Sequence, residues 1–208
     1  RLEGANALTV TLDYGNGTVV KSGDATVNVS YSKLNLNNVR NVNLTSKYSK
    51  LTVENGADLN ADSRYDEFQL TKIDRLTCTT KYGNMTVGNA ESISATGQYT
   101  DFKVSRLQES GTFDLMYGGL RIENVSKGFS KINLVGKYSD FKIGGENGAS
   151  YVLDANANFA GIAYPDGLVV TYEQEKGTSH SVKGHAGAQN ARSTIQASLN
   201  YGGLKVKQ

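Results

Sequence analysis

The chain has 208 residues, a mass of 22.4 kDa and a formal net charge of +2, from 22 basic and 20 acidic residues. This near balance gives no general argument for nucleic acid or an anionic membrane surface as a partner. The single cysteine excludes an intramolecular disulfide framework and a cysteine-rich zinc site. The 23 glycines, the one proline and the many Asn, Thr, Ser and Tyr residues favour strands and tight turns over helices.

An aromatic residue returns along the chain, first in steps of 17 residues and later in steps of 18 and 21. The last step, from Phe159 to Tyr201, is 42 residues, and we predict that it contains one degenerate turn. A unit of about 17 residues cannot bury its own apolar face, so the units must stack as a solenoid. The aromatic positions are Tyr14, Tyr31, Tyr48, Tyr65, Tyr82, Tyr99, Tyr117, Tyr138, Phe159 and Tyr201.

Apolar residues keep a fixed phase within each unit, at +3 and +5, at +8, and at +11 and +13 from the aromatic residue. Steps of two are typical of a strand with one buried face, and the phase changes between them predict corners. Asn residues at +6 or +7, such as Asn38 and Asn55, are expected at a tight corner because Asn tolerates left-handed backbone angles. In one unit the apolar template holds Leu51, Val53, Gly56, Leu59 and Ala61.

This phased template predicts an all-β fold, a single-stranded parallel β-helix (β-solenoid) with rungs of about 17–21 residues. We expect a single domain over residues 1–208, with a less regular C-terminal insertion at about 164–197. The insertion is predicted to be a hairpin or long loop plus a degenerate rung. A twisted β-sandwich is the rival fold, but it would give hairpin turns and variable strand spacing.

The strand phase also predicts the direction of the tyrosine rings. Counted back from Tyr48 through Ser46 and Leu44, the ring points inward if the chain bends at residues 49–50. We therefore expect a stacked tyrosine ladder that lines a corner of the core, with neighbours about 4.8 Å apart. The functional alternative is an exposed aromatic strip that stacks on sugar rings.

No catalytic, cofactor-binding or metal-binding motif is present in the sequence. His180 and His185 lack further ligands at workable spacing, so an exposed polar loop is the favoured interpretation. Cys78 lies at an inward +13 position and is expected to be a small buried core residue.

Four acidic residues, Asp66, Glu67, Asp101 and Asp140, share the +1/+2 corner. Paired carboxylates about 5 to 10 Å apart would serve glycoside hydrolysis. Asn and Gly residues interrupt this row and no basic cluster accompanies it, so solvated corner charges are the favoured interpretation.

A row of cations occupies the outward +4 position in the later units. It holds Lys103, Arg121 and Lys142, and Lys205 follows at the same phase. Like charges on adjacent strands repel each other, so this row predicts a surface for an anionic ligand. Screening by solvent together with neutralisation by the nearby Asp101 and Asp140 is nevertheless the favoured interpretation.

Units such as KYGNMTV (81–87) and KYSDFKI (137–143) recur along the chain, and a Gly-x-x-Gly segment, Gly184–Gly187, precedes a final strand, Asn200–Val206. In these features the chain resembles the bacterial putative-adhesin family of β-strand-repeat (β-helix) cell-envelope domains. The resemblance implies an exported β-helix of the cell envelope without known catalysis, and it supplies no catalytic residues.

Together these observations predict a non-enzymatic cell-envelope or surface solenoid, an adhesin-like scaffold or binding module that needs no cofactor. The alternative is a carbohydrate-active enzyme, a polysaccharide lyase or glycosidase, on a parallel β-helix. The expected partner is a glycan or another cell-envelope component rather than nucleic acid, and the exposed solenoid ends predict self-association.

No apolar run in the chain is long enough to cross a bilayer. We expect a periplasmic, outer-membrane-anchored or cell-surface location, with a targeting segment that is not part of this sequence.

Overall fold

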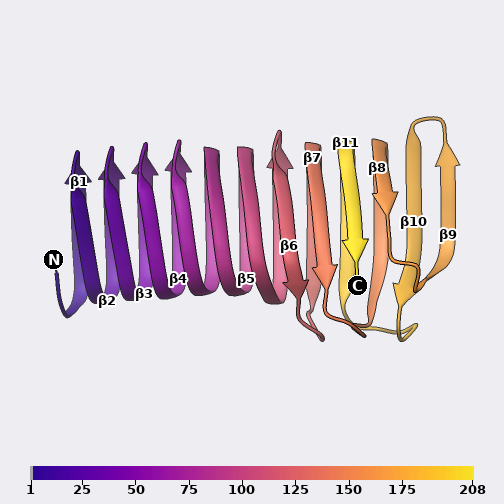
Figure 1. Cartoon of the computed structure of the whole chain (residues 1–208), viewed down its shortest axis with the longest axis horizontal. Helices are drawn as coiled ribbons and strands as arrows, with labels where there is room; N and C mark the ends of the chain where they lie inside the picture. The colour runs from indigo at the N-terminus through magenta and orange to yellow at the C-terminus, as the bar shows by residue number, and fades with distance from the viewer. Residues whose placement is uncertain (1) are drawn as a thin grey trace.

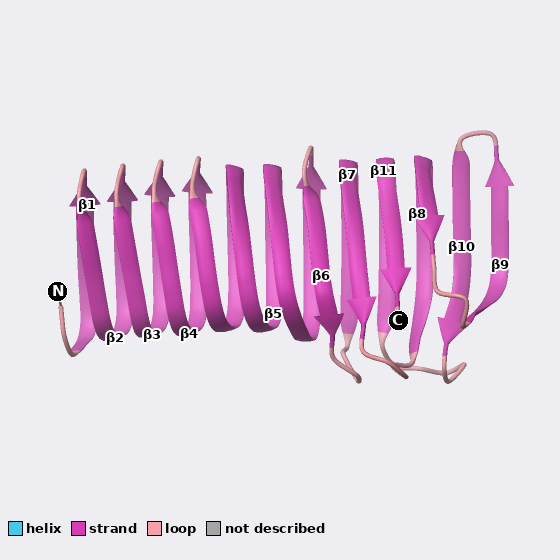
Figure 2. Ribbon diagram, viewed as in Figure 1, coloured by secondary structure: helices cyan, strands magenta, loops and turns pink. Residues whose placement is uncertain are grey.

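The computed structural model describes residues 2–208 and is an all-β rod of stacked parallel coils (Figures 1 and 2). The predicted β-solenoid is confirmed. Within the described residues, no helix is long and apolar enough to cross a membrane.

All eleven strands belong to one hydrogen-bonded sheet that winds around the rod. From β1 to β7 each strand pairs in parallel with the next, and β5 alone, with 50 residues, runs through nearly three coils. The strands are β1 (Ala5–Asp13), β2 (Asn16–Ser30), β3 (Lys33–Lys47), β4 (Lys50–Arg64), β5 (Glu67–Met116), β6 (Gly119–Val125), β7 (Lys131–Gly145), β8 (Tyr151–Ala163), β9 (Leu168–Lys176), β10 (Ser179–Ala186) and β11 (Thr194–Lys207).

The core follows the predicted apolar template. Equivalent residues lie directly opposite each other on adjacent coils, as Leu34, Leu51 and Phe68 do. All +3, +5, +11 and +13 residues of units 31–98 are buried, and burial of each Leu, Val, Ile or Phe side chain contributes roughly 1.5–3 kcal/mol. Cys78 is buried among them, as predicted, and desolvation raises the pKa of its thiol to about 12.

The aromatic residue of each coil is itself the corner. All ten have φ angles of 50–61°, in the left-handed region, whereas no Asn among residues 2–208 has a positive φ. The prediction that Asn forms a left-handed corner is therefore wrong. Left-handed backbone costs a non-glycine residue roughly 1–2 kcal/mol, so some compensating interaction must favour tyrosine here.

Stacking provides this compensation. Neighbouring rings are stacked with centroids 4.6–4.9 Å apart and planes within 2–9° of parallel. Each aromatic pair contributes about 0.5–1.5 kcal/mol beyond its buried area. We call these nine tyrosine rings and the ring of Phe159 the tyrosine column; in space it begins at Tyr14 and ends at Phe159, with Tyr201 next to last. The predicted ladder is confirmed.

The rings point outward, however, so the prediction that they line the core is wrong. Their exposed fractions range from 36% to 79%. The left-handed angle at Tyr48 turns its ring to solvent and resets the alternation, so that Ser49, at +1, takes the inward position. The bend lies on the tyrosine, not on residues 49–50.

Side-chain oxygens at +1 hold this corner together from one coil to the next. The hydroxyl of Ser32 accepts the N–H of Gly15 at 2.9 Å, and that of Ser49 accepts the N–H of Ser32 at 3.2 Å. In the next coil a carboxylate oxygen of Asp66 accepts the N–H of Ser49 at 2.6 Å. A left-handed corner leaves this N–H outside the sheet ladder, so the side chain satisfies a buried donor.

The C-terminal end departs from simple sequential stacking. Strand β11 lies between β7 and β8 and pairs in parallel with both, so Tyr201 stacks between Tyr138 and Phe159 (Figure 1). The predicted hairpin is present, because β9 and β10 are antiparallel and β10 pairs with the outer edge of β8. The 42-residue step therefore contains no additional parallel coil, and the predicted degenerate rung is wrong.

Candidate functional site

The predicted cation row lies on four adjacent strands. Lys103 is opposite Arg121, Arg121 is opposite Lys142, and Lys142 is opposite Lys205. Successive side chains are thus about 4.8 Å apart along the rod. We call these four residues the basic row, and all of them are exposed.

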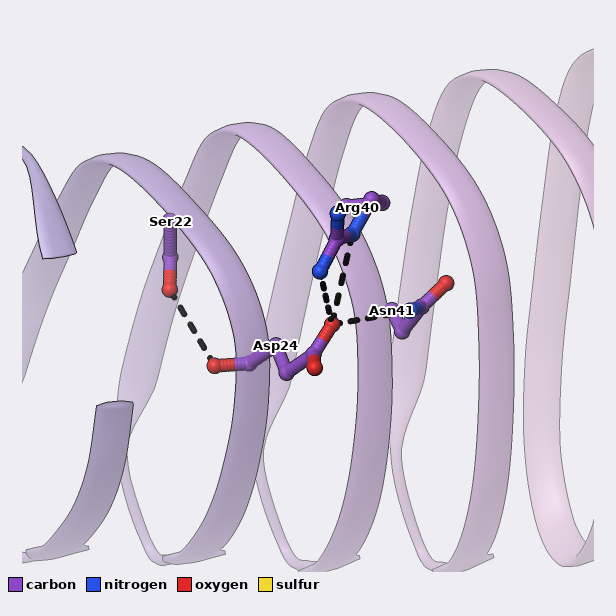
Figure 3. Close-up of polar contacts among 4 residues, drawn as sticks. All are labelled: Ser22, Asp24, Arg40 and Asn41. Atoms are coloured by element: carbon purple, nitrogen blue, oxygen red, sulfur yellow. Dashed lines mark hydrogen bonds and ion pairs between the residues drawn. The ribbon is translucent and has the colours of Figure 1, made fainter. Parts of the chain in front are cut away.

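Elsewhere on the rod, opposite charges face each other on neighbouring strands. Arg40 donates to Asp24 Oδ1 from Nη2 at 3.0 Å, and Asn41 donates to the same oxygen at 2.8 Å (Figure 3). These bonds, that of Arg40 first, lower the pKa of the Asp24 carboxyl. Further pairs are Arg75 with Asp58, Lys50 with Glu67, and Lys183 with Asp154. In the basic row, by contrast, cation faces cation on each adjacent strand, as also happens for Lys47, Arg64 and Lys81.

One carboxylate, that of Glu123, forms ion pairs with two of the four cations in the basic row. Glu123 Oε1 lies 3.5 Å from Lys103 Nζ and 3.8 Å from Arg121 Nε. All three side chains are largely exposed, so each contact contributes little. Within the described part of the chain, Lys142 and Lys205 have no ion-pair partner within 4.0 Å.

The expected neutralisation by Asp101 and Asp140 is not found, since neither forms an ion pair within residues 2–208. Both instead line a hollow of about 400 Å³ together with the first three cations of the basic row. Gly119 separates the two carboxylates on the intervening strand, so their backbones are two spacings, about 9.6 Å, apart. The expectation that no cations accompany the corner carboxylates is therefore wrong.

The four acidic corner residues have three different environments. Asp66 is buried and accepts hydrogen bonds from Ser46 Oγ at 2.7 Å and from the N–H groups of Ser49 and Arg64. Burial nevertheless raises the pKa of its carboxyl. Glu67 is paired with Lys50, and Asp101 and Asp140 share the hollow beside the basic row. The interpretation of Asp66 as a solvated charge is wrong, because the tyrosine corner makes +1 an inward position.

The histidines lie on strand β10 rather than in an exposed loop. His180 Nε2 is 2.9 Å from Glu173 Oε1 and 3.7 Å from Glu175 Oε1, and its side chain is mostly buried. Contact with His180 and a hydrogen bond from Tyr164 lower the pKa of the Glu173 carboxyl. Among residues 2–208 no His, Cys, Asp and Glu cluster suits a metal ion, so this group joins the two hairpin strands.

Sequence reasoning missed a second hollow beside the tyrosine column. A groove of about 870 Å³ runs along the rings of Tyr14 to Tyr82, with small +1 residues as its floor and Lys33 and Lys50 in its opposite wall. It was missed because the rings were predicted to point inward. The sequence did indicate a bend, because the aromatic residue and the apolar residue at +3 have opposite strand parity. The bend was predicted at +1 and +2, whereas it lies on the aromatic residue itself.

Comparison with known proteins adds no relative to this description. No family model, curated protein or solved structure matches the chain.

Proposed function

We propose that this protein is a non-enzymatic binding solenoid of the cell envelope or cell surface, an adhesin-like module that binds an anionic glycan or another anionic envelope component. The observation that carries the proposal is the basic row. It sets four cations in register against one weakly placed carboxylate, Glu123, and two of the four have no ion-pair partner among residues 2–208.

The hollows beside the basic row support the proposal. One is lined by Lys103, Arg121 and Lys142 beside Asp101 and Asp140, and another of about 570 Å³ is lined by Arg121, Lys142, Lys205 and Lys207. A ligand lying in either hollow would place its anions near Lys142, which lines both hollows and has no ion-pair partner among residues 2–208. The resemblance of the tyrosine units to exported envelope domains supports the location.

A binding screen against glycans and envelope components tests the proposal. The wild type is compared with a variant carrying Lys103→Ser, Arg121→Ser and Lys142→Ser together. We expect the affinity for anionic ligands to fall by about tenfold or more, and wild-type affinity to fall as salt screens the charges. Equal binding by both proteins would remove the basic row as a site.

The chain offers a matched control on the other side of the tyrosine column. Lys47, Arg64 and Lys81 are also two lysines and one arginine on adjacent strands, and Asp13 and Asp62 lie in the hollow beside the first two. Changing these three residues to Ser removes the same charge. Binding should persist in this variant, so an equal loss in both triple variants would indicate general charge attraction instead.

The carbohydrate-active enzyme remains the second candidate because Asp101 and Asp140 line one hollow. Their backbones are about 9.6 Å apart, close to the range of about 6.5–9.5 Å that separates the two carboxyl groups of an inverting glycoside hydrolase. Reducing-end and unsaturated-product assays on anionic polysaccharides test it. Turnover by the wild type that is lost with Asp101→Asn or Asp140→Asn would replace the non-enzymatic proposal.

A further inference from the structure

The three hollows on this flank are continuous. The groove beside the tyrosine column ends at Asn84, which also lines the hollow of Asp101 and Asp140. Arg121 and Lys142 line this second hollow and also the third. Since each hollow shares lining residues with the next, they form one groove that runs obliquely along the rod.

This groove is nearly as long as the rod. Its first coil contains Tyr14 and its last contains Lys205, and these coils are eight stacking steps apart in the tyrosine column. Eight steps correspond to about 38 Å. A groove of this length and openness fits an extended polymer better than a compact small molecule, which binds in an enclosed pocket.

The tyrosine wall presents ring edges and hydroxyls rather than ring faces. Each inner ring has a neighbour within 4.9 Å on both sides, nearly parallel to it, so its two faces are covered. Ring edges carry the positive end of the aromatic quadrupole. None of the column's hydroxyls has a hydrogen-bond partner within residues 2–208, whereas those of Tyr164 and Tyr172 do.

This arrangement excludes the usual aromatic binding modes. Single-stranded nucleic acids bind by stacking bases on open aromatic faces, and those faces are absent along the column. Because the ring faces are covered, the alternative interpretation of the tyrosines as a strip that stacks on sugar rings is also disfavoured. Free hydroxyls, positive ring edges and the ammonium group of Lys33, beside that of Lys50, which is paired with Glu67, favour oxygen-rich, anionic groups instead.

The charges along the groove select among polyanions. Cations and carboxylates are mixed along it, because Glu67, Asp101, Asp140 and Glu123 line the same path as the lysines and Arg121. Carboxylates repel a densely charged chain such as duplex DNA, which has one charge per about 1.7 Å. They accept hydrogen bonds from sugar hydroxyls, so the mixture suits a hydroxylated chain with more widely spaced anions.

We propose that the whole groove binds a single anionic polysaccharide chain lying along the rod, from the tyrosine column to the basic row. This inference rests on the proposed function, since the basic row supplies one half of the groove. The column half adds contacts from Lys33, Lys50 and the tyrosine hydroxyls. Affinity then depends on the length of the polysaccharide. Once one half of the groove has bound it, a chain long enough to reach the other half is present there at a high effective concentration.

Calorimetric titration with oligogalacturonates and hyaluronan fragments of increasing length tests this. Affinity should rise by about tenfold or more until the chain spans about 38 Å, and then level off. In a Lys33→Ser, Lys50→Ser variant, long chains should bind only as tightly as short ones do. A Tyr31→Phe, Tyr48→Phe variant keeps the stacking, as Phe159 does, and should also lose part of this gain.

Lys47→Ser with Lys81→Ser removes the same charge from the other side of the column and should retain the length dependence. Circular dichroism and unfolding temperature establish that each variant is folded. If affinity does not depend on length, or if the Lys33 and Lys50 changes have no effect, the continuous groove is refuted while the basic row stands. If the basic-row triple variant binds all lengths like the wild type, the proposed function itself fails. Tighter binding of duplex DNA or polyphosphate than of either polysaccharide at equal salt would refute the ligand class.

Discussion

The carboxylate of Asp66 accepts the backbone N–H of Ser49 across adjacent coils at 2.6 Å, in a place where other coils use a serine hydroxyl. A carboxylate therefore replaces a neutral group in a buried row beneath the tyrosine column. Three hydrogen bonds offset part of the cost of burying this charge. The pKa of the Asp66 carboxyl is still raised, because desolvation is the largest effect.

This burial gives a pH dependence of known sign. Because the pKa of Asp66 is higher in the folded state than in the unfolded chain, where it is about 3.9, the folded state holds the proton more tightly. The free energy of unfolding contributed by Asp66 should fall as pH rises from about 3.9 through the higher folded-state pKa, and be constant above it.

Denaturant unfolding of the wild type, Asp66→Ser and the isosteric Asp66→Asn between acidic and neutral pH measures this effect. As pH rises, the unfolding free energy of each neutral variant should increase relative to that of the wild type. A shift toward the wild type would show that its hydrogen bonds outweigh burial.

A second prediction concerns the balance of strain and stacking in the tyrosine column. Tyr65 has φ of 61° and stacks on two neighbours, Tyr48 and Tyr82. Tyr65→Phe should change the unfolding free energy little, because it keeps both stacks. Tyr65→Ala should destabilise by about 2–3 kcal/mol, since it loses two pairs and keeps the strain.

Tyr65→Gly separates the two contributions. Glycine adopts the left-handed angle without strain, so this variant should be about 1 kcal/mol more stable than Tyr65→Ala. Equal stability of the Phe and Ala variants would mean that stacking does not hold the corner.

Cys78 provides a probe of core integrity. It is 3% exposed and its thiol pKa is raised to about 12, so the reactive thiolate is nearly absent at neutral pH. Iodoacetamide should leave the folded protein unmodified and label it completely in denaturant, as read by mass spectrometry. Rapid labelling without denaturant would show that the core opens locally.

Strand β9 is the open edge of the sheet, and Val169, Val170 and Tyr172 on it are exposed. An unpaired edge with apolar side chains is a template for another strand. The predicted self-association should appear in light scattering as a mass that rises above 22.4 kDa with concentration. Val169→Lys with Tyr172→Lys should restore the monomer mass, and no effect of these changes would place any association elsewhere.

The fold was largely predictable because one phase runs through the sequence. Leu51, Val53, Leu59 and Ala61 lie where the template puts them, since parallel coils in register repeat each inward position. The basic row followed from the same periodicity. Its four cations all lie at +4 in the sequence repeat, and in the structure they lie opposite each other on adjacent strands.

The direction of the tyrosine rings was not predictable from propensity. Left-handed angles are rare in tyrosine and common in Asn and Gly, so local preference pointed to the wrong residue. Only contact between coils stabilises Tyr48 in this conformation. The burial of Asp66 and the groove beside the column were missed for the same reason.

The position of β11 could not be predicted from the sequence. Every parallel coil carries the same apolar repeat, so the repeat does not show in which order the coils stack. Nothing in the sequence of Asn200–Val206 distinguishes stacking on β8 alone from insertion between β7 and β8.

The insertion of β11 has a consequence for how the protein acquires its structure. A simple solenoid can grow one coil at a time, each new turn templated by the last. Here β8 cannot join the rod until β11, which begins 31 residues after β8 ends, has entered between it and β7. The last turn thus closes by a non-local step, which is slow because a long loop must be ordered first. This end of the rod therefore stays open until β11 is available to join β7 to β8.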